Sequence, residues 1–476
     1  MHHIQLEVDI AKGSLMHPVP RSQPLGKNPP RKAAENHWLI YLLVVSPVLF
    51  RATRYAISMA TRGAAEPLSI LEIGLLLAVL YQVFVRWLFL RQPPVVLCRS
   101  DAFVLLFVLA AALSVVAILY EPVDHTETLK AFVRLMEYVA LYMIVSTNIR
   151  SWQAIKKLMV CLVGCGVAVS LLAIIQYILG PLTSTDYFPW GTWWNAFDFA
   201  ASFRAYSFFS NTLYVVAYLS IVWPINLGLL VGERGSKNRL PYLAALLLNS
   251  VAVLLTFSRS AVVGLAVALF VFAKERARFA IAGGVAVLLI GSYLMPEELR
   301  VRLFLESRES RESILGRFER YEEALSLYAT HPLFGVGIGN YLTYYSGGVP
   351  QVGERSYFEA TPGAINSTTW LRRDYQRYTA ENTFLQYSGE MGTIGILAFL
   401  ALCVHFLTLL WKLRKKYAAS DVWVVGLFAG LLGFLACSMF TTLTAVEMNS
   451  AFWLLLGISK ALWLRRPRTE PEVRSV

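Results

Sequence analysis

Charge is scarce in this sequence, and its scarcity excludes most soluble functions. Only 16% of the 476 residues are charged, whereas soluble domains carry about 25%, and 56% are hydrophobic. Apolar runs of about 18 or more residues recur along the chain, which indicates a polytopic membrane protein. The runs are too long and too apolar for the alternating strands of a barrel. We therefore expect an all-α membrane protein, because helices satisfy every backbone group inside lipid.

Cysteine is rare as well, and the usual catalytic and metal-binding motifs are missing. The sequence holds no HExxH, no Cys/His cluster, no GxxxxGK[ST], no GxSxG and no Asp-x-Asp pair in an outer loop. The five cysteines all lie in or beside hydrophobic runs: Cys98, Cys161, Cys165, Cys403 and Cys437. This distribution argues against a disulfide framework or a zinc cluster, and we expect neither a metal nor a cofactor.

The hydrophobic runs predict twelve transmembrane helices. Their approximate ranges are 38–58, 68–90, 102–120, 130–148, 156–180, 211–231, 239–257, 259–274, 278–295, 383–411, 421–441 and 450–464. The polar pair Ser258–Arg259 predicts a tight turn between the seventh and eighth helices. The resulting domains are a disordered basic tail (1–36), nine spans (37–295), a large loop (296–382), three spans (383–464) and a second tail (465–476).

The net charge of +12 is distributed as in an oriented membrane protein rather than as in a nucleic-acid-binding one. If the N-terminus is cytoplasmic, every inner segment is basic, whereas outer loops such as EPVDHTET and TAVEMN are acidic or neutral. We therefore expect both termini in the cytoplasm and basic residues that contact anionic lipid headgroups. Arg51, Arg54 and Arg62 depart from this rule, and whether they contribute to a site stays open.

Two of the predicted outer loops are large enough to carry chemistry. The first, about 181–210, is dense in aromatic residues, and its three tryptophans suit either the headgroup level of the membrane or stacking on sugar faces. The second, about 296–382, contains apolar residues at helical spacing. That spacing predicts an amphipathic helix that ends before Pro332.

A few charged residues lie at the predicted membrane edge, where burial of a charge costs up to roughly 2.5–3.5 kcal/mol and needs a reason. Arg259, in LLTFSRSAVVGLAV, is either a turn arginine that reaches headgroup phosphates or part of an inward-facing anion site. Arg204, just before the sixth span, allows the same two interpretations. Arg134 and Glu137 lie three residues apart on one helix and predict a structural ion pair.

Glycine is concentrated in two short segments near the large loop. The three glycines of HPLFGVGIGNY follow a predicted helix rather than a strand, which favours a tight loop with close backbone packing over a dinucleotide site. His331, in the same segment, is interpreted as structural. Glu390, in GEMGTIG, predicts close helix packing with a buried hydrogen bond.

Four segments together resemble the O-antigen ligase and O-antigen polymerase family. They are FRAYSFFSNTLYVVAYL (203–219), LLTFSRSAVVGLAV (254–267), GRFERYEEALSLYATHPLFGVGIGNY (316–341) and ENTFLQYSGEMGTIGILAFL (381–400). The resemblance implies a glycosyltransferase of the bacterial inner membrane whose active site faces the periplasm. Its donor would be a glycan on undecaprenyl diphosphate. The acceptor is implied to be lipid A–core for a ligase and another lipid-linked repeat unit for a polymerase.

The resemblance also implies which residues carry the chemistry. Outer-loop arginines would hold the diphosphate: Arg204 and Arg259 by motif, with Arg317 and Arg320 as further candidates. Glu381 occupies the position that activates the acceptor hydroxyl, although it is equally placed to complement the dipole of the tenth span. The candidate catalytic residues are thus Glu381, Arg259 and Arg204, and the candidate supporting residues are Asn211, Tyr321 and Asn382.

Several functions remain open at this point. Ligases of the family carry His–Asn where this chain has Glu381–Asn382, so the sequence favours a polymerase of O-antigen, capsule or exopolysaccharide repeats, with a ligase as the alternative. A transporter of lipid-linked sugars would predict two related halves, which the sequence does not show. The expected partners are the lipid-linked glycan, a glycan or lipid A–core acceptor and membrane lipids. A chain-length regulator is left open, and nucleic acid is excluded.

Overall fold

The apolar runs of the sequence form helices wherever the computed structural model describes them. The described residues are 40–46, 48, 70–89, 91, 95–119, 125–149, 151–179, 205, 207–209, 212–233, 235–273, 308–341, 379–442 and 446–464. Every regular element in these ranges is a helix, so the predicted all-α class is confirmed for this part of the chain. The predicted tails and the ninth span at 278–295 lie outside the described residues.

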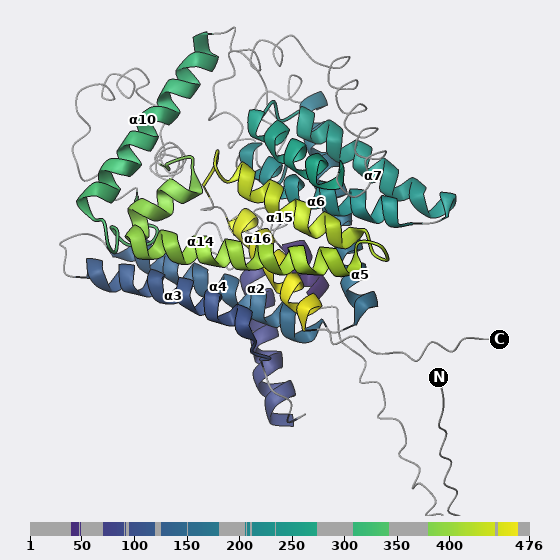
Figure 1. Cartoon of the computed structure of the whole chain (residues 1–476), viewed down its shortest axis with the longest axis horizontal. Helices are drawn as coiled ribbons and strands as arrows, with labels where there is room; N and C mark the ends of the chain where they lie inside the picture. The colour runs from purple at the N-terminus through teal and green to yellow at the C-terminus, as the bar shows by residue number, and fades with distance from the viewer. Residues whose placement is uncertain are drawn as a thin grey trace, which may run out of the picture. The chain divides into compact units, whose positions relative to one another are not determined.

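Helices follow one another through short connections over most of the described chain (Figure 1). In chain order the long ones are α2 (Ile70–Leu80), continued by the π-helix η1 (Tyr81–Phe89), α3 (Arg99–Ile118), α4 (Thr126–Asn148), α5 (Trp152–Leu179), α6 (Thr212–Gly232), α7 (Ser236–Leu254), α10 (Arg308–Thr330), α14 (Thr383–Tyr417), α15 (Trp423–Cys437) and α16 (Val446–Trp463). A further helix, Arg259–Ala273, follows α7. Turns at 255–257 separate these two helices, which confirms the predicted tight turn, although Arg259 begins the second helix instead of lying in the turn.

Four of the described helices are long and apolar enough to cross a membrane: α3, α5, α6 and α14. Two further apolar helices, Arg259–Ala273 and α15, are shorter than these four. Large apolar side chains point outward from the bundle, and Phe270 is 78% exposed. Such exposure is unfavourable in water and favourable in lipid, so the chain is a membrane protein. The number of twelve spans remains a prediction.

The most extensive helix pair, α6 with α15, is held together by backbone contact. A Cβ atom on Gly426 of α15 would lie 2.5 Å from the carbonyl oxygen of Pro224 inside α6, and one on Gly228 would lie 2.7 Å from the Cα of Trp423. Only glycine allows the two backbones to approach so closely. The pair therefore forms a rigid centre to which α5, α7 and α16 are added through contacts with α6.

Helix α14 is too long for a single straight membrane crossing, and it is kinked. Its 35 residues would extend about 52 Å at 1.5 Å per residue, whereas the hydrocarbon core is about 30 Å thick. Gly392 interrupts the helix with φ 63° and ψ −163°. The long part after Gly392 packs along α3, and the short part before it lies next to α10 (Figure 1).

Among the described residues, one ion pair between α3 and α16 is enclosed in the bundle. Lys460 of α16 is 0% exposed, and its Nζ lies 2.6 Å from Oδ1 of Asp101 in α3. The hydroxyl of Tyr142 in α4 donates to the same carboxylate oxygen at 2.9 Å. One buried carboxylate thereby joins the consecutive helices α3 and α4 to α16, which is distant in the sequence.

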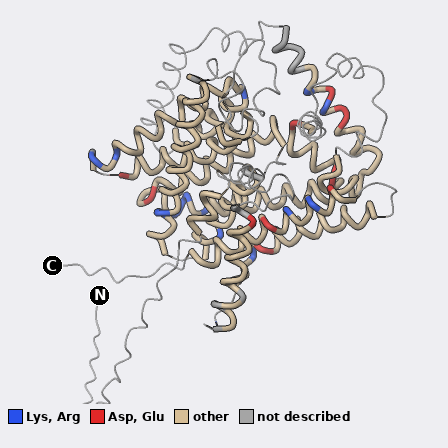
Figure 2. Tube along the Cα trace, turned by 180° about the vertical axis from the view of Figure 1, so that it is seen from behind, with Lys and Arg blue, Asp and Glu red and all other residues tan. Residues whose placement is uncertain are grey.

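The predicted pair of Arg134 and Glu137 is confirmed, with 3.1 Å between Nη1 and Oε2. Arg134 also pairs with Glu72, so it connects α4 to α2 rather than serving α4 alone. The five cysteines are free. Among the described helices, charge is concentrated on α10, where basic and acidic residues are interleaved, while the rest of the bundle is mostly uncharged (Figure 2).

Candidate active site

Glu381 is held by two arginines of α10. Its Oε2 accepts a hydrogen bond from Nε of Arg317 at 2.8 Å, and its Oε1 forms an ion pair with Nη1 of Arg320. Arg317 and Arg320 are three residues apart on the helix, so their side chains project from the same face. The three side chains are between 21% and 28% exposed, which leaves them within reach of a ligand.

The backbone around Glu381 is fixed on α15. Thr383, the first residue of α14, donates its N–H to the carbonyl of Ser438 at 2.9 Å and its hydroxyl to the carbonyl of Thr441 at 2.8 Å. Asn382 caps α14, since its side-chain oxygen accepts the N–H groups of Phe384 and Leu385. Glu381 itself has φ +46°, a left-handed conformation that is uncommon for a residue with a side chain.

Arg259 approaches the same place from a third element. It begins the helix that follows α7, and the carbonyl of its neighbour Ser260 accepts the thiol of Cys437, the last residue of α15, at 3.3 Å. Its guanidinium charge interacts with that of Arg317. In the part of the chain that the structure describes, Arg259 forms no ion pair with a carboxylate. We call Arg259, Arg317 and Arg320 the arginine cluster.

Tyr321 completes the attachment of α10 to this region. Its hydroxyl lies 3.3 Å from the carbonyl oxygen of Met439, one residue beyond Ser438. Helix α10, the start of α14 and the helix beginning at Arg259 therefore meet around the C-terminal end of α15. Two guanidinium groups bond to one carboxylate there, and the charge of Arg259 acts on that of Arg317, so the local positive charge suits an anion with more than one negative charge.

A loop with three positive-φ glycines places α10 against α14. Gly335, Gly337 and Gly339 have φ of +69°, +90° and +78°, and a Cβ on Gly335 would lie 2.3 Å from the backbone carbon of Glu390. The N–H of Val336 donates to the carbonyl of Gly389 at 3.0 Å. The predicted tight loop with close backbone packing is confirmed. The sequence did not predict its contact partner, which is the kinked part of α14.

Glu390 is the buried carboxylate that closes this contact. It is 2% exposed and accepts a hydrogen bond from Nε2 of Gln386 at 2.8 Å. The backbone N–H groups of Gly339 and Tyr341 bond to it as well. The predicted buried hydrogen bond is confirmed, and the loop donors could not have been identified from GEMGTIG alone, because they lie some fifty residues earlier in the chain.

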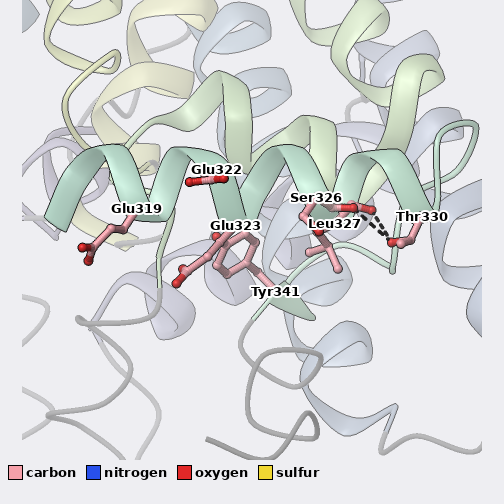
Figure 3. Close-up of a pocket in the computed structure, with 7 residues that line it drawn as sticks. All are labelled: Glu319, Glu322, Glu323, Ser326, Leu327, Thr330 and Tyr341. Carbon is pink, nitrogen blue, oxygen red and sulfur yellow. Dashed lines mark hydrogen bonds between the residues drawn. The ribbon is translucent and has the colours of Figure 1, made fainter. Parts of the chain in front are cut away.

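An acidic hollow lies on another face of α10. Its lining residues are Glu319, Glu322, Glu323, Ser326, Leu327, Thr330 and Tyr341 (Figure 3). The hollow does not include the arginine cluster or Glu381. Among the described residues, no three His, Cys, Asp or Glu side chains are grouped so that they could hold a metal ion.

The structure thus brings together Arg259, Arg317, Arg320 and Glu381, with Asn382 and Tyr321 supporting the elements that carry them. Arg204 and Asn211 lie outside the described residues, so their membership of the site stays a prediction. The same holds for Arg51, Arg54 and Arg62.

Comparison with known proteins shows which family this part of the chain resembles. Residues 244–400 match the family model described as O-antigen ligase. The match includes the arginine cluster, Glu381 and the glycine loop, and it confirms the resemblance to that family for the segments 254–267, 316–341 and 381–400; the segment 203–219 lies outside it. It supports a membrane glycosyltransferase of the ligase or polymerase type. No curated protein matches the chain.

Proposed function

Because residues 244–400 are similar to the O-antigen ligase family, we propose that the arginine cluster binds the diphosphate of an undecaprenyl-diphosphate-linked glycan on the periplasmic side of the inner membrane. The observation that supports this most directly is that Arg317 and Arg320 both bond to Glu381, with the charge of Arg259 close enough to act on that of Arg317. Guanidinium groups match the geometry of phosphate oxygens and remain charged at all physiological pH values.

In the proposed reaction, the oxygen of an acceptor hydroxyl attacks the anomeric carbon of the donor glycan. The bond between that carbon and the diphosphate oxygen breaks, and its electron pair stays on the diphosphate. Negative charge therefore grows on the leaving group, where the arginine cluster stabilises it. The products are the new glycosidic bond and undecaprenyl diphosphate.

Glu381 is proposed to accept the proton of the acceptor hydroxyl. A hydroxyl is a poor nucleophile, and a base within hydrogen-bond reach increases the rate by about 10²–10⁴-fold. Glu381 sits beside the cluster on a backbone fixed by Thr383, which keeps its side chain near the proposed leaving group. Arg204 is proposed to add a further guanidinium to the diphosphate site.

The glutamate at position 381 favours a polymerase of lipid-linked repeat units over a ligase. Ligases of the family use His–Asn at the positions of Glu381–Asn382. The products of a polymerase would be repeat units of O-antigen, capsule or exopolysaccharide, and a chain-length regulator would be a natural partner.

The decisive experiment supplies the purified protein with undecaprenyl-diphosphate oligosaccharide as the sole substrate. A polymerase extends it into a ladder of longer lipid-linked products, whereas a ligase reacts only when lipid A–core is added. If the protein instead moves the intact lipid-linked oligosaccharide across a vesicle membrane and forms no new glycosidic bond, it is a transporter and not a glycosyltransferase.

A further inference from the structure

Each oxygen of the Glu381 carboxylate is bonded to an arginine, as the oxygens of a bound anion would be. Oε2 is bonded to Arg317 and Oε1 to Arg320, so the carboxylate lies between the two guanidinium groups. A base that must take a proton from an acceptor needs an oxygen directed towards that acceptor. The arrangement in the structure is therefore suited to filling the anion site rather than to accepting a proton.

Charge at the site favours replacement of this carboxylate by a stronger anion. Arg317 and Arg320 are bonded to a single negative charge, and Arg259, which interacts electrostatically with Arg317, adds a third positive charge. A diphosphate carries more negative charge than a carboxylate and offers more acceptor oxygens. It can bond to all three guanidinium groups, whereas one glutamate side chain bonds to two.

The backbone at position 381 allows such a replacement without refolding. Ala380 on one side is 0% exposed, and Thr383 on the other side is bonded twice to the end of α15. Glu381 stands between these fixed points at φ +46°. Strained backbone of this kind is often retained where a side chain has to be presented in a particular direction. The carboxylate can leave the arginines by rotation of its own side-chain bonds.

We propose that Glu381 is an internal stand-in for the donor diphosphate. It neutralises Arg317 and Arg320 when the site is empty, and the diphosphate displaces it on binding and frees it to face the acceptor. This inference rests on the proposed function, because it takes the arginine cluster to be the diphosphate site. Its consequence is an order of binding: the acceptor hydroxyl meets a free base only after the donor has arrived.

The first test uses the unaltered protein in detergent and inorganic pyrophosphate as the probe. Accessible carboxylates are coupled to glycine ethyl ester with a carbodiimide, and the labelled positions are measured by mass spectrometry. Pyrophosphate should increase labelling of Glu381 and leave labelling of Glu319, an exposed acid on α10, unchanged. Unchanged or lower labelling of Glu381 in pyrophosphate-saturated protein would overturn the inference.

The second test measures pyrophosphate affinity by calorimetry. Glu381→Gln removes the competing charge and should tighten binding by about fivefold or more, the range expected for coupled binding events. Glu381→Asp keeps the charge and should bind like the unaltered protein, as should the matched control Glu319→Gln. Equal or weaker binding by Glu381→Gln would show that the carboxylate organises the arginines for the ligand instead. Failure of every variant to bind pyrophosphate would contradict the proposed donor site itself.

Discussion

At the scale of single residues, the charge of the site depends on which arginines have a carboxylate partner. Arg317 and Arg320 share Glu381, whereas Arg259 forms no ion pair with a carboxylate in the described ranges. No carboxylate among the described residues neutralises Arg259, which favours contact between its guanidinium group and a bound anion. Arg259 should therefore contribute more to donor binding and to stabilisation of the leaving group than its position at a helix start suggests.

Arg259→Ala should reduce glycan transfer by about 10²–10³-fold, because a preorganised positive charge on the leaving diphosphate is lost. Transfer is measured with purified protein and lipid-linked oligosaccharide, and membrane levels are compared by immunoblot. Lys130→Ala is the matched control, since Lys130 pairs with Glu127 on the exposed surface of α4 and should have no effect on rate. Normal polymer from Arg259→Ala would remove Arg259 from the site.

Glu381→Gln should slow transfer by about 10²–10⁴-fold, because an amide cannot take up the acceptor proton. Glu381→His should retain part of the rate, since a neutral imidazole can act as a base at the same position. The rates of both variants are compared at equal protein and saturating donor. Near-native turnover by the glutamine variant would reduce Glu381 to a carboxylate that complements the start of α14.

The sequence predicted these residues better than their partners. The spacing of Arg317 and Arg320 on an amphipathic helix places them on one face, which local periodicity predicts. Their bond to Glu381 spans 64 positions for Arg317, and no local pattern contains that information. The double role of Arg134, which bonds to Glu72 as well as to Glu137, was missed for the same reason.

At the scale of elements, the orientation of α10 depends on the loop that follows it. The loop donates Val336 N–H to Gly389, and the carbonyls of Pro332 and Leu333 accept the N–H groups of Thr393 and Ile394 beyond the kink. These bonds use the backbone groups that Gly392 releases from the helical pattern. Since α10 carries two members of the arginine cluster, the loop sets the position of the site.

Gly335→Ala should destabilise the protein by at least about 1–3 kcal/mol, because φ +69° is unfavourable for alanine and its Cβ would collide with the backbone of Glu390. Gly316→Ala is the control: a Cβ there meets nothing within 4 Å, and the change in α10 should be neutral or stabilising by up to about 1 kcal/mol. Thermal unfolding in detergent measures both. Equal midpoints for the two variants would argue against the close contact.

Lys460→Met should destabilise the bundle by about 3–5 kcal/mol, because it leaves the Asp101 carboxylate buried without its ammonium partner. The double variant Asp101→Leu/Lys460→Met should recover part of that loss, since neither charge then remains while the Tyr142 hydroxyl loses its acceptor. Unfolding by heat or by a denaturing detergent ranks the three proteins. If the double variant is no more stable than Lys460→Met, the unpaired charge of Asp101 is not the cause of the destabilisation.

At the scale of the whole molecule, the basic segments predict that α14 starts outside and ends inside the cell. With the five native cysteines replaced, Glu322→Cys on α10 should react with a membrane-impermeant maleimide from the periplasmic side. Lys416→Cys at the end of α14 should react only after the inner membrane is opened. Both positions are exposed, so reactivity reports the side of the membrane. The reverse pattern would place the arginine cluster in the cytoplasm.

The architecture was predictable as far as hydrophobicity determines it. Apolar runs gave the existence of most described helices, and Pro332 correctly marked the end of α10. The kink in α14 was not predicted, because a glycine inside an apolar run is compatible with a straight helix as well as a broken one. Its cause is the loop at 331–341, which approaches through tertiary packing that a single sequence does not display.

The buried pair of Asp101 and Lys460 has a consequence for how the protein is made. The two residues are 359 positions apart, so α3 enters the membrane long before the ribosome has synthesised α16. Until α16 is inserted, the Asp101 carboxylate lacks the ammonium group of Lys460. A nascent chain interrupted before Val446 would keep that charge uncompensated, and surveillance proteases would be expected to distinguish truncated copies from full-length ones by this defect.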